Sequence, residues 1–406
     1  MKKNEWRGNK GEWGEAFTLL WFLAGNCLYN ADIHGNKLLN EPNVVLAVLR
    51  TETSGAKNIF VIHEHDVVVK KDGVVIGTFD KSIFKEAACS LFERIQKQGR
   101  SASHPEQELL KRIGCESLKA GSNEKADLIA VVRDGFLAST VPRLYSIKTL
   151  IGSNPSLANA SGHSYIDYEL KNFDCLNAED CKIIDASAKS KIVDKTNYIL
   201  SVCNSPVPHI RSDTFKRNLL RCHWEAPEIV GMAFLYGQRH QGKYVIDSIA
   251  DLVERNPLSI ERDDYSDAIR QYLLGTVLKL TPGRPWQGPV QVDGYLLATN
   301  DGEVLSYQVS QLREFADHLL LHACWDTPST DRHPYTGAIE QREDGTWIYT
   351  LNCCVRYNKK EYPEKECAES KKRLAGIEES HERDALIRSL VQGLHESEGS
   401  DYTALS

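Results

Sequence analysis

Two strand-like runs that are close together in the sequence constrain the fold of this chain more than any other feature. The first run begins with an acid at Asp127 and continues through apolar residues to Val132, and the turn-forming pair Asp134-Gly135 follows it. The second run ends at Lys148. Strands joined by so short a connection pair with each other, so the pattern predicts that Asp127 and Lys148 lie side by side in one sheet.

The residue types at these positions predict metal-dependent hydrolysis. Carboxylate oxygens are ligands for Mg²⁺, and a lysine beside them orients or activates the attacking water. Metal-dependent nucleases use such a pattern, in which an Asp is followed on the next strand by acid-x-Lys. In this chain Ser146 takes the place of the middle acid, on the same strand face as Lys148. Because a hydroxyl lacks the charge of a carboxylate, another segment has to supply a second acid.

Each of these residues also has a structural interpretation. Asp127 is alternatively an acid that caps a turn at a strand end, and Lys148 is alternatively a solvated lysine. His63 and His65 share one face of a predicted strand, but two ligands are too few for a metal site. We therefore interpret these histidines as exposed or hydrogen-bonded residues.

Composition limits the classes of protein that fit. The 406 residues are enough for one large domain or two ordinary ones. The N-terminal segment is polar, unlike a secretory signal, and no apolar run is long enough to cross a membrane. The 11 cysteines include no CxxC pair, which favours reduced thiols in a cytoplasmic protein. A net charge of −7 argues against a general polyanion binder, but an acidic DNA enzyme needs only one basic cleft.

Hydrophobic periodicity predicts alternating helices and strands, and therefore an α/β protein with a mixed sheet. We expect helices at residues 11–23, 84–98, 105–114, 263–280 and 310–324. We expect strands at residues 43–49, 58–69, 73–78 and 347–356, and hairpins at 231–248 and 293–308. Two segments rich in turn-forming residues are expected to be loops, at residues 149–163 and 281–290.

Four stretches of the sequence resemble the HpaII family of type II restriction endonucleases. They are GEWGEAFTLLWFLA, KADLIAVV, YSIKTLIGSNPSLANASG and DTPSTDRHPYTGAIEQREDGTWIYTLN. They occur in the order found in the family and span roughly residues 6–356. The Ser-x-Lys strand with the loop after it, and the DTPSTDRH segment, are far more specific than a bare acid-x-Lys pattern.

This resemblance implies a variant of the PD-(D/E)xK restriction-endonuclease-like core with N- and C-terminal elaborations. It implies Mg²⁺-dependent cleavage of double-stranded DNA at a short palindromic CCGG-type site, and a companion DNA methyltransferase that protects the host. Palindromic sites favour a homodimer, although some enzymes nick each strand as monomers. The chain departs from the family pattern at Ala126, where a proline is expected, and at Ser146.

On this interpretation residues 1–356 form one large endonuclease domain. Within it we expect N-terminal elements of the DNA cleft at 1–110, the catalytic core at 111–250 and DNA-recognition elements at 251–356. Residues 357–406 are dominated by charged residues and are expected to form a helical appendix.

The acid that Ser146 does not supply has a candidate later in the chain. Other restriction enzymes with Ser-x-Lys take it from a later helix, and Glu169 stands at the start of a helix-like segment here. Asp167 is the nearby competitor, on a different face of that helix. The alternative for Glu169 is a capping or surface acid.

In this nuclease class a Glu on the N-terminal helix reaches the metal site, so we expect a further acid from this helix. Glu15 is a better candidate than Glu12, because it borders the apolar face of the helix. The alternative for both residues is an acid that only favours the helix dipole. We thus expect Asp127 and Glu169 to hold Mg²⁺ with help from Glu15.

Polar residues outside the two strands are candidates for DNA contacts. Small amide and hydroxyl side chains contact phosphates and base edges, and arginine is the preferred reader of guanine. The candidates are Ser153, Asn154, Asn159, Ser161, Arg284, Arg332 and His333. The alternatives are an ordinary polar loop and, for Arg332, a buried pair with Asp326 or Asp331.

Two other functions stay open on the sequence alone. One is a nuclease-fold protein that binds DNA without cutting it, since the acid at position 146 is missing. The other is a nuclease for modified, damaged or single-stranded DNA. A hydrolase of small phosphates would need more His and Asp ligands than this cluster offers.

Overall fold

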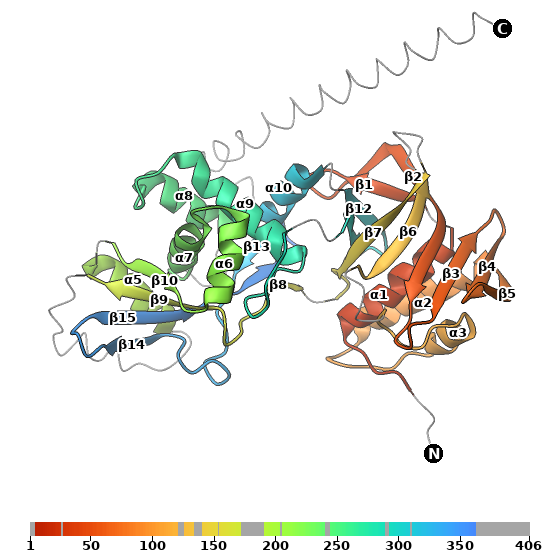
Figure 1. Ribbon diagram of the computed structural model, residues 1–406, viewed down its shortest axis with the longest axis horizontal. Coiled ribbons are helices and arrows are strands. Elements are labelled where there is room, and N and C mark those ends of the chain that lie inside the picture. Colours follow the sequence, from red (N-terminus) through yellow and green to blue (C-terminus); the bar gives the residue numbers. More distant parts are fainter. Residues whose placement is uncertain are drawn as a thin grey trace, which may run out of the picture. The chain divides into compact units, whose positions relative to one another are not determined.

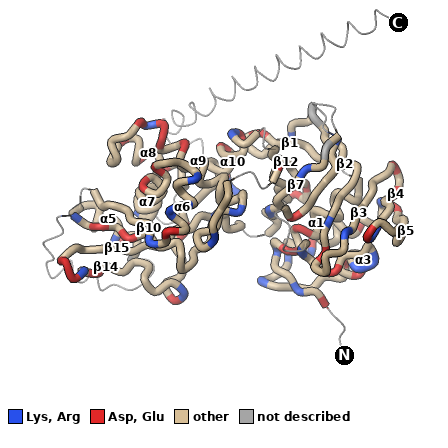
Figure 2. Tube along the Cα trace, viewed as in Figure 1, with Lys and Arg blue, Asp and Glu red and all other residues tan. Residues whose placement is uncertain are grey.

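The computed structural model describes residues 5–25, 27–120, 126–133, 140–152, 154–171, 191–203, 205–239, 244–288, 292–308 and 311–362 (Figure 1). By its contacts the chain divides into two units, Met1–Lys359 and Lys360–Ser406. The elements described below belong to the first unit. In the described part of the chain, basic and acidic residues are scattered along the trace among uncharged stretches (Figure 2).

The largest sheet has nine strands and is mixed. In spatial order they are β1 (Leu28–Ala31), β12 (Val304–Gln308), β11 (Gly294–Ala298), β7 (Thr140–Thr149), β6 (Leu128–Arg133), β2 (Lys37–Thr51), β3 (Lys57–Ile62), β4 (Asp66–Lys71) and β5 (Val74–Asp80). Strand β7 pairs in parallel with β11 and antiparallel with β6. The predicted mixed α/β fold is therefore confirmed, as is the hairpin at 293–308, which forms β11 and β12.

Helix α1 (Lys10–Leu23) covers β7, and α2 (Lys81–Lys97) packs on α1 (Figure 1). A capping box between Asn9 and Glu12 starts α1. From residue 16 onward every side chain of α1 is buried, because the helix lies between the sheet and α2. Figure 1 also shows α3 (Gln107–Arg112) beside this sheet.

Gly14 sets how closely α1 approaches the sheet. A Cβ atom at this position would lie 2.5 Å from Cβ of Thr149, near the end of β7. No side chain fits that gap, so the helix would have to move away from the strand. Glycine at position 14 thus brings the next residue, Glu15, close to the end of β7.

Two smaller sheets and a group of helices follow in the sequence. One sheet runs β10 (Val207–Ile210), β9 (Tyr165–Leu170), β15 (Trp347–Asn352) and β14 (Ala338–Gln341), and the other runs β13 (Ala323–Trp325), β16 (Val355–Tyr357) and β8 (Ser156–Ala158). The helices are α5 (Lys191–Val202), α6 (Asp213–Cys222), α7 (Ala226–Gly237), α8 (Val245–Arg255), α9 (Arg262–Val277) and α10 (Leu312–His322).

The hairpin predicted at 231–248 is wrong, because these residues belong to α7 and α8. Every residue of α7 except the half-buried Glu228 is buried, and the helix contacts α6, α8, α9 and β10. A helix enclosed on all sides has no polar face, so its sequence lacks the 3.6-residue periodicity that identifies helices.

The single strand predicted at 58–69 is also wrong. Strand β3 ends at Ile62 and β4 begins at Asp66, so the segment is a hairpin. His63 and His65 lie exposed in the turn between them rather than on one strand face. The segment at 347–356 is likewise divided, between β15 and β16. Among the described residues, no helix is both long and apolar enough to span a membrane.

Candidate active site

Asp127 is fixed at the start of β6 by hydrogen bonds from β7. Its backbone N–H donates to the carbonyl of Tyr145 at 2.9 Å. Its Oδ2 accepts from Ser146 Oγ at 3.0 Å and from the N–H of Ile147 at 2.9 Å. These donors orient the carboxylate and leave Oδ1 turned to other partners. The role of Ser146, which is 1% exposed, is thus to hold Asp127.

Glu15 lies close enough to Asp127 for the two carboxylates to repel each other. Burial and the charge of Asp127 raise the pKa of Glu15 to about 7. Two acids close enough to influence each other's charge are a common feature of sites that bind cations. Glu12, by contrast, caps the helix and forms an ion pair with Lys119 at 2.9 Å.

Lys148 joins this pair of acids from β7. It is partly buried, and desolvation lowers its pKa, while Asp127 and Glu15 oppose this effect. Its neighbour across the parallel pairing with β11 is Leu297. The predicted proximity of Asp127 and Lys148 is therefore observed, and it arises from the antiparallel pairing of β6 with β7.

Lys279 belongs to the same cluster and was not predicted from the sequence. Its Nζ lies 3.0 Å from Oδ1 of Asp127. Lys279 follows α9 with a φ of 69°, and the N–H of Leu280 donates to the carbonyl of Gly275 at 2.8 Å. This is a Schellman-type helix end, where the left-handed position is usually glycine. The lysine keeps an unfavourable backbone conformation there, and no motif in the sequence signals it.

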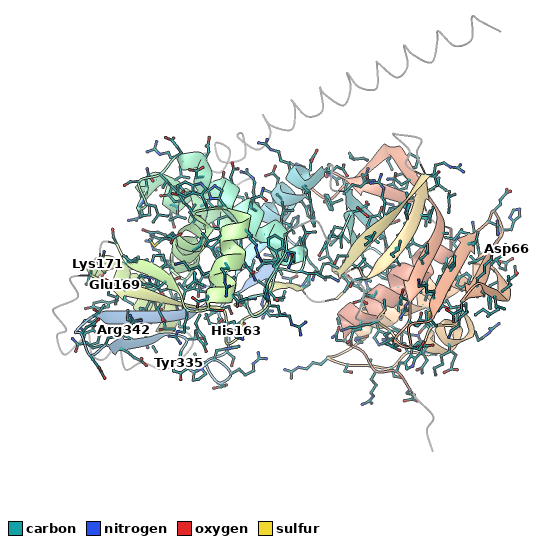
Figure 3. The ribbon with its side chains drawn as sticks, viewed as in Figure 1. Asp66, His163, Glu169, Lys171, Tyr335 and Arg342 are labelled. Atoms are coloured by element: carbon teal, nitrogen blue, oxygen red, sulfur yellow. The ribbon has the colours of Figure 1, made fainter. Side chains whose placement is uncertain are left out.

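Glu169 does not join the cluster, and the helix predicted for it is wrong. It lies in β9, within the four-stranded sheet, where its Oε2 is 3.2 Å from Nε2 of His209 (Figure 3). The aromatic and β-branched residues of YIDYEL favour the strand over the helix. The structure thus brings Asp127 together with Glu15 rather than with Glu169.

Asp167, the competing acid, is held by a separate network in β9. Arg211 donates to its two carboxylate oxygens at 2.6 and 3.0 Å, and Thr350 Oγ1 donates at 2.8 Å. Arg211 also lies over the rings of Tyr165 and Tyr335. Asp167 is therefore satisfied by its own neighbours.

The donor set of Glu15 and Asp127 fits a magnesium ion better than a zinc ion. Within the described ranges, no three His, Cys, Asp or Glu side chains gather closely enough to hold a metal ion. Zinc sites need three or four protein ligands. Mg²⁺ is usually held by one or two carboxylates, with water and substrate phosphate completing the shell. A divalent cation would also relieve the repulsion between the two carboxylates.

Some of the residues predicted to contact DNA meet in one polar pocket. Asn159, Arg332 and His333 line it, together with Ser156 and Ser329. Arg332 is exposed, so its predicted alternative as a buried residue is wrong. The alternative partner Asp326 forms its ion pair with Arg356 instead.

The other predicted DNA contacts have different surroundings. Asn154 accepts a hydrogen bond from the N–H of Lys359, and Ser161 Oγ accepts one from the N–H of His163, so both side chains stabilise their loop. Arg284 is exposed next to Trp286, which is buried. Ser153 lies outside the described residues.

Two carboxylates and two lysines, gathered from the β6–β7 pair, α1 and the end of α9, provide the groups that metal-dependent hydrolysis of phosphodiesters requires. The chain belongs to the HpaII restriction endonuclease family, whose profile matches residues 9–357. The chain is therefore an endonuclease that cleaves DNA at specific sites, and the resemblance found in its sequence is confirmed. It is 29% identical over 364 residues to the type II restriction enzyme HpaII of Haemophilus parainfluenzae, covering 86% of this chain and 98% of that enzyme. No solved structure matches the chain.

Proposed function

We propose that this protein hydrolyses phosphodiesters of duplex DNA in a Mg²⁺-dependent reaction at a short palindromic site of the CCGG type. The observation that carries the proposal is the arrangement of Glu15, Asp127 and Lys148 at the joint between α1, β6 and β7. The CCGG type of site is what the family resemblance implies.

Glu15 and Asp127 are the residues that would hold the metal ion. When bound, Mg²⁺ supplies charge stabilisation to the phosphate and lowers the pKa of a coordinated water. Ser146 and the N–H of Ile147 keep Asp127 oriented. Gly14 lets α1 approach β7 closely and so keeps Glu15 near the end of that strand. The second acid thus comes from the N-terminal helix and not from Glu169.

The two lysines would have different tasks. Lys148 is partly desolvated beside the acids, where it orients the attacking water and offsets negative charge on the phosphate. Lys279 pairs with Oδ1 of Asp127 and adds a second positive charge to the cluster. Both positive charges favour a transition state that is more negative than the substrate.

Base recognition is assigned to the polar pocket lined by Asn159, Arg332 and His333. An exposed arginine presents two N–H donors to O6 and N7 of guanine, and an asparagine would contact a backbone phosphate. Arg284 would contact the backbone. The palindromic site favours a homodimer, and a companion methyltransferase would protect the host DNA.

Digestion of unmethylated phage DNA tests this function. We expect discrete fragments whose ends map to one short palindrome, with no fragments in EDTA. The substitutions Asp127→Ala and Lys148→Ala should each abolish cleavage while the proteins stay folded. Specific binding without any cleavage by the unaltered protein would instead indicate a nuclease fold that only binds DNA, and preference for modified or single-stranded DNA would indicate a different substrate.

A further inference from the structure

Two lysines from opposite ends of the first unit meet at one glycine. Lys10 lies in the first turn of α1, and its side chain covers Gly152, where an added Cβ would lie 2.1 Å from Lys10 Nζ. Lys359 donates from its own Nζ to the carbonyl oxygen of Gly152. Gly152 has a φ of +91°, a backbone conformation that favours glycine, in the loop that follows β7. Both ammonium groups therefore lie against the same short stretch of backbone.

Side-chain amides hold this arrangement in place. Asn300 Oδ1 accepts from the N–H of Gly152 at 3.3 Å and from Lys359 Nζ at 3.2 Å. Asn154 Oδ1 accepts from the N–H of Lys359, and Asn154 Nδ2 donates to Asn358. Lys10 Nζ also donates to the carbonyl of Gln96. The two lysines are thus positioned by neutral oxygen atoms.

Among the residues that the structure describes, the positive charges of Lys10 and Lys359 are not matched by a carboxylate within ion-pair distance. Within the described part of the chain neither lysine forms an ion pair, whereas Lys279, Lys119 and Lys71 each pair with a carboxylate. Burial and the charge of Lys10 lower the pKa of Lys359. Two partly buried cations facing each other raise the free energy of the ligand-free protein, and an anion between them would remove that repulsion.

The position of the two lysines indicates that this anion is a phosphate of the DNA backbone. Lys10 precedes Glu15 by five residues in the same helix, a separation of about 7.5 Å along the helix axis. Gly152 follows shortly after Thr149, which touches Gly14. One strand of DNA carries a phosphate about every 3.4 Å along the duplex axis. A strand with its scissile phosphate at Glu15 and Asp127 therefore brings a neighbouring phosphate to Lys10 and Lys359.

We propose that Lys10 and Lys359 bind a backbone phosphate of the cleaved strand, near the scissile one, and so fix the register of the DNA on the catalytic acids. The proposal rests on the proposed function, since it places the DNA strand by the acids. Contacts of this kind position the duplex and read no bases. Their loss should weaken specific and non-specific binding alike.

The test is a binding titration of labelled duplex DNA in EDTA, followed by fluorescence anisotropy at several salt concentrations. The variant Lys10→Met/Lys359→Met keeps both aliphatic stems and removes both charges. We expect about ten-fold weaker binding for the loss of charged hydrogen bonds. The slope of log K against log salt should fall by about 0.9 for one phosphate. The matched control is Lys85→Met, because Lys85 is exposed on α2, and it should change neither quantity.

A second set of binding measurements identifies which backbone phosphate the two lysines contact. Single uncharged methylphosphonate linkages are placed along the strand, and one position close to the cut should weaken binding by the unaltered protein but not by the double variant. An unchanged salt slope, or equal sensitivity of both proteins at every linkage, would overturn the inference. The failure of the proposed function is a separate outcome, namely no cleavage of any duplex by the unaltered protein.

Discussion

Asp127 directly precedes strand β6 and Asp167 lies in β9, and both contact a basic side chain, but their surroundings differ. Asp167 is 6% exposed, and Arg211 and Thr350 together supply three hydrogen bonds. Asp127 receives two hydrogen bonds on one oxygen, while its other oxygen meets Lys279, whose side chain is 39% exposed. A second carboxylate, Glu15, also lies close to Asp127.

The difference shows how a structural acid is distinguished from an acid of an active site. The charge of Asp167 is balanced by a two-pronged arginine, so its network stabilises the folded protein. Asp127 is balanced in part by Lys279, but the pKa of the buried Glu15 beside it remains raised, so having both acids charged opposes folding and favours metal binding. Four substitutions follow from this comparison.

The largest effect is expected for Asp127→Asn. The amide oxygen keeps the hydrogen bonds from Ser146 and Ile147, but the charge that holds the metal ion is lost. We expect the cleavage rate in Mg²⁺ to fall by about a thousand-fold or more, with the thermal unfolding midpoint nearly unchanged. Single-turnover cleavage and circular dichroism measure the two quantities. Cleavage within ten-fold of the unaltered enzyme would remove Asp127 from the site.

Glu15→Gln is expected to lower cleavage by about a hundred-fold. In EDTA the same variant should be at least as stable as the unaltered protein, because the cost of burying the Glu15 charge and its repulsion with Asp127 are both gone. Urea unfolding in EDTA measures the stability. The Glu12→Gln variant is the neighbouring control, since Glu12 caps the helix and should affect stability and not chemistry. A loss of stability in Glu15→Gln would mean that Glu15 is a structural acid like Asp167.

Asp167→Asn should have the opposite effect. Arg211 loses its charged partner in a network with Thr350, and we expect about 2 kcal/mol less free energy of unfolding. Cleavage per folded molecule should change little. A variant that keeps full stability but loses cleavage would reverse the assignment of the two aspartates.

The smallest effect is expected for His318→Gln. It concerns the loss of stability at acid pH, which we attribute to His318 and not to either aspartate. Burial lowers the pKa of His318 to about 3, so the folded protein keeps this imidazole neutral while the unfolded chain binds a proton below about pH 6.5. The contribution of His318 to the free energy of unfolding is therefore fully present above pH 6.5. It is lost as the pH falls, by about 2 kcal/mol at pH 5. His322, His34 and the hydroxyl of Tyr357 are its polar neighbours.

The measurement is the pH dependence of urea unfolding in His318→Gln. The slope between pH 6.5 and 4.5 should fall by about one proton relative to the unaltered protein. The exposed residue His163 provides the control, and His163→Gln should leave the slope unchanged (Figure 3). Equal slopes in all three proteins would show that His318 does not govern acid unfolding.

The sequence predicted those parts of the fold whose patterns are local. The β6–β7 pair and α1 follow from clear alternation or helical spacing, and they place Asp127, Lys148 and Glu15. Helix α7 was missed because it is apolar on all sides. The sequence around Glu169 predicts a helix, whereas the structure has strand β9 there, so Glu169 lies in other surroundings than predicted.

Lys279 was not predicted from the sequence because its place in the site depends on a tertiary contact. Lys279 reaches Asp127 through the end of α9, at a separation of 152 residues in the sequence. Nothing in the residues around Lys279 indicates this contact, because it depends on how α9 ends and packs. The role of Gly14 in the close approach of α1 to the sheet is likewise visible only in the structure, where Thr149 lies beside it.

The most direct test of the central claim is a calorimetric titration of Mn²⁺ and Mg²⁺ into the DNA-bound protein. The account predicts metal binding by the unaltered protein and by Asp167→Asn, and its loss in Asp127→Asn and Glu15→Gln. Metal binding that survives both of the latter substitutions, or that is lost only with Asp167, would contradict it.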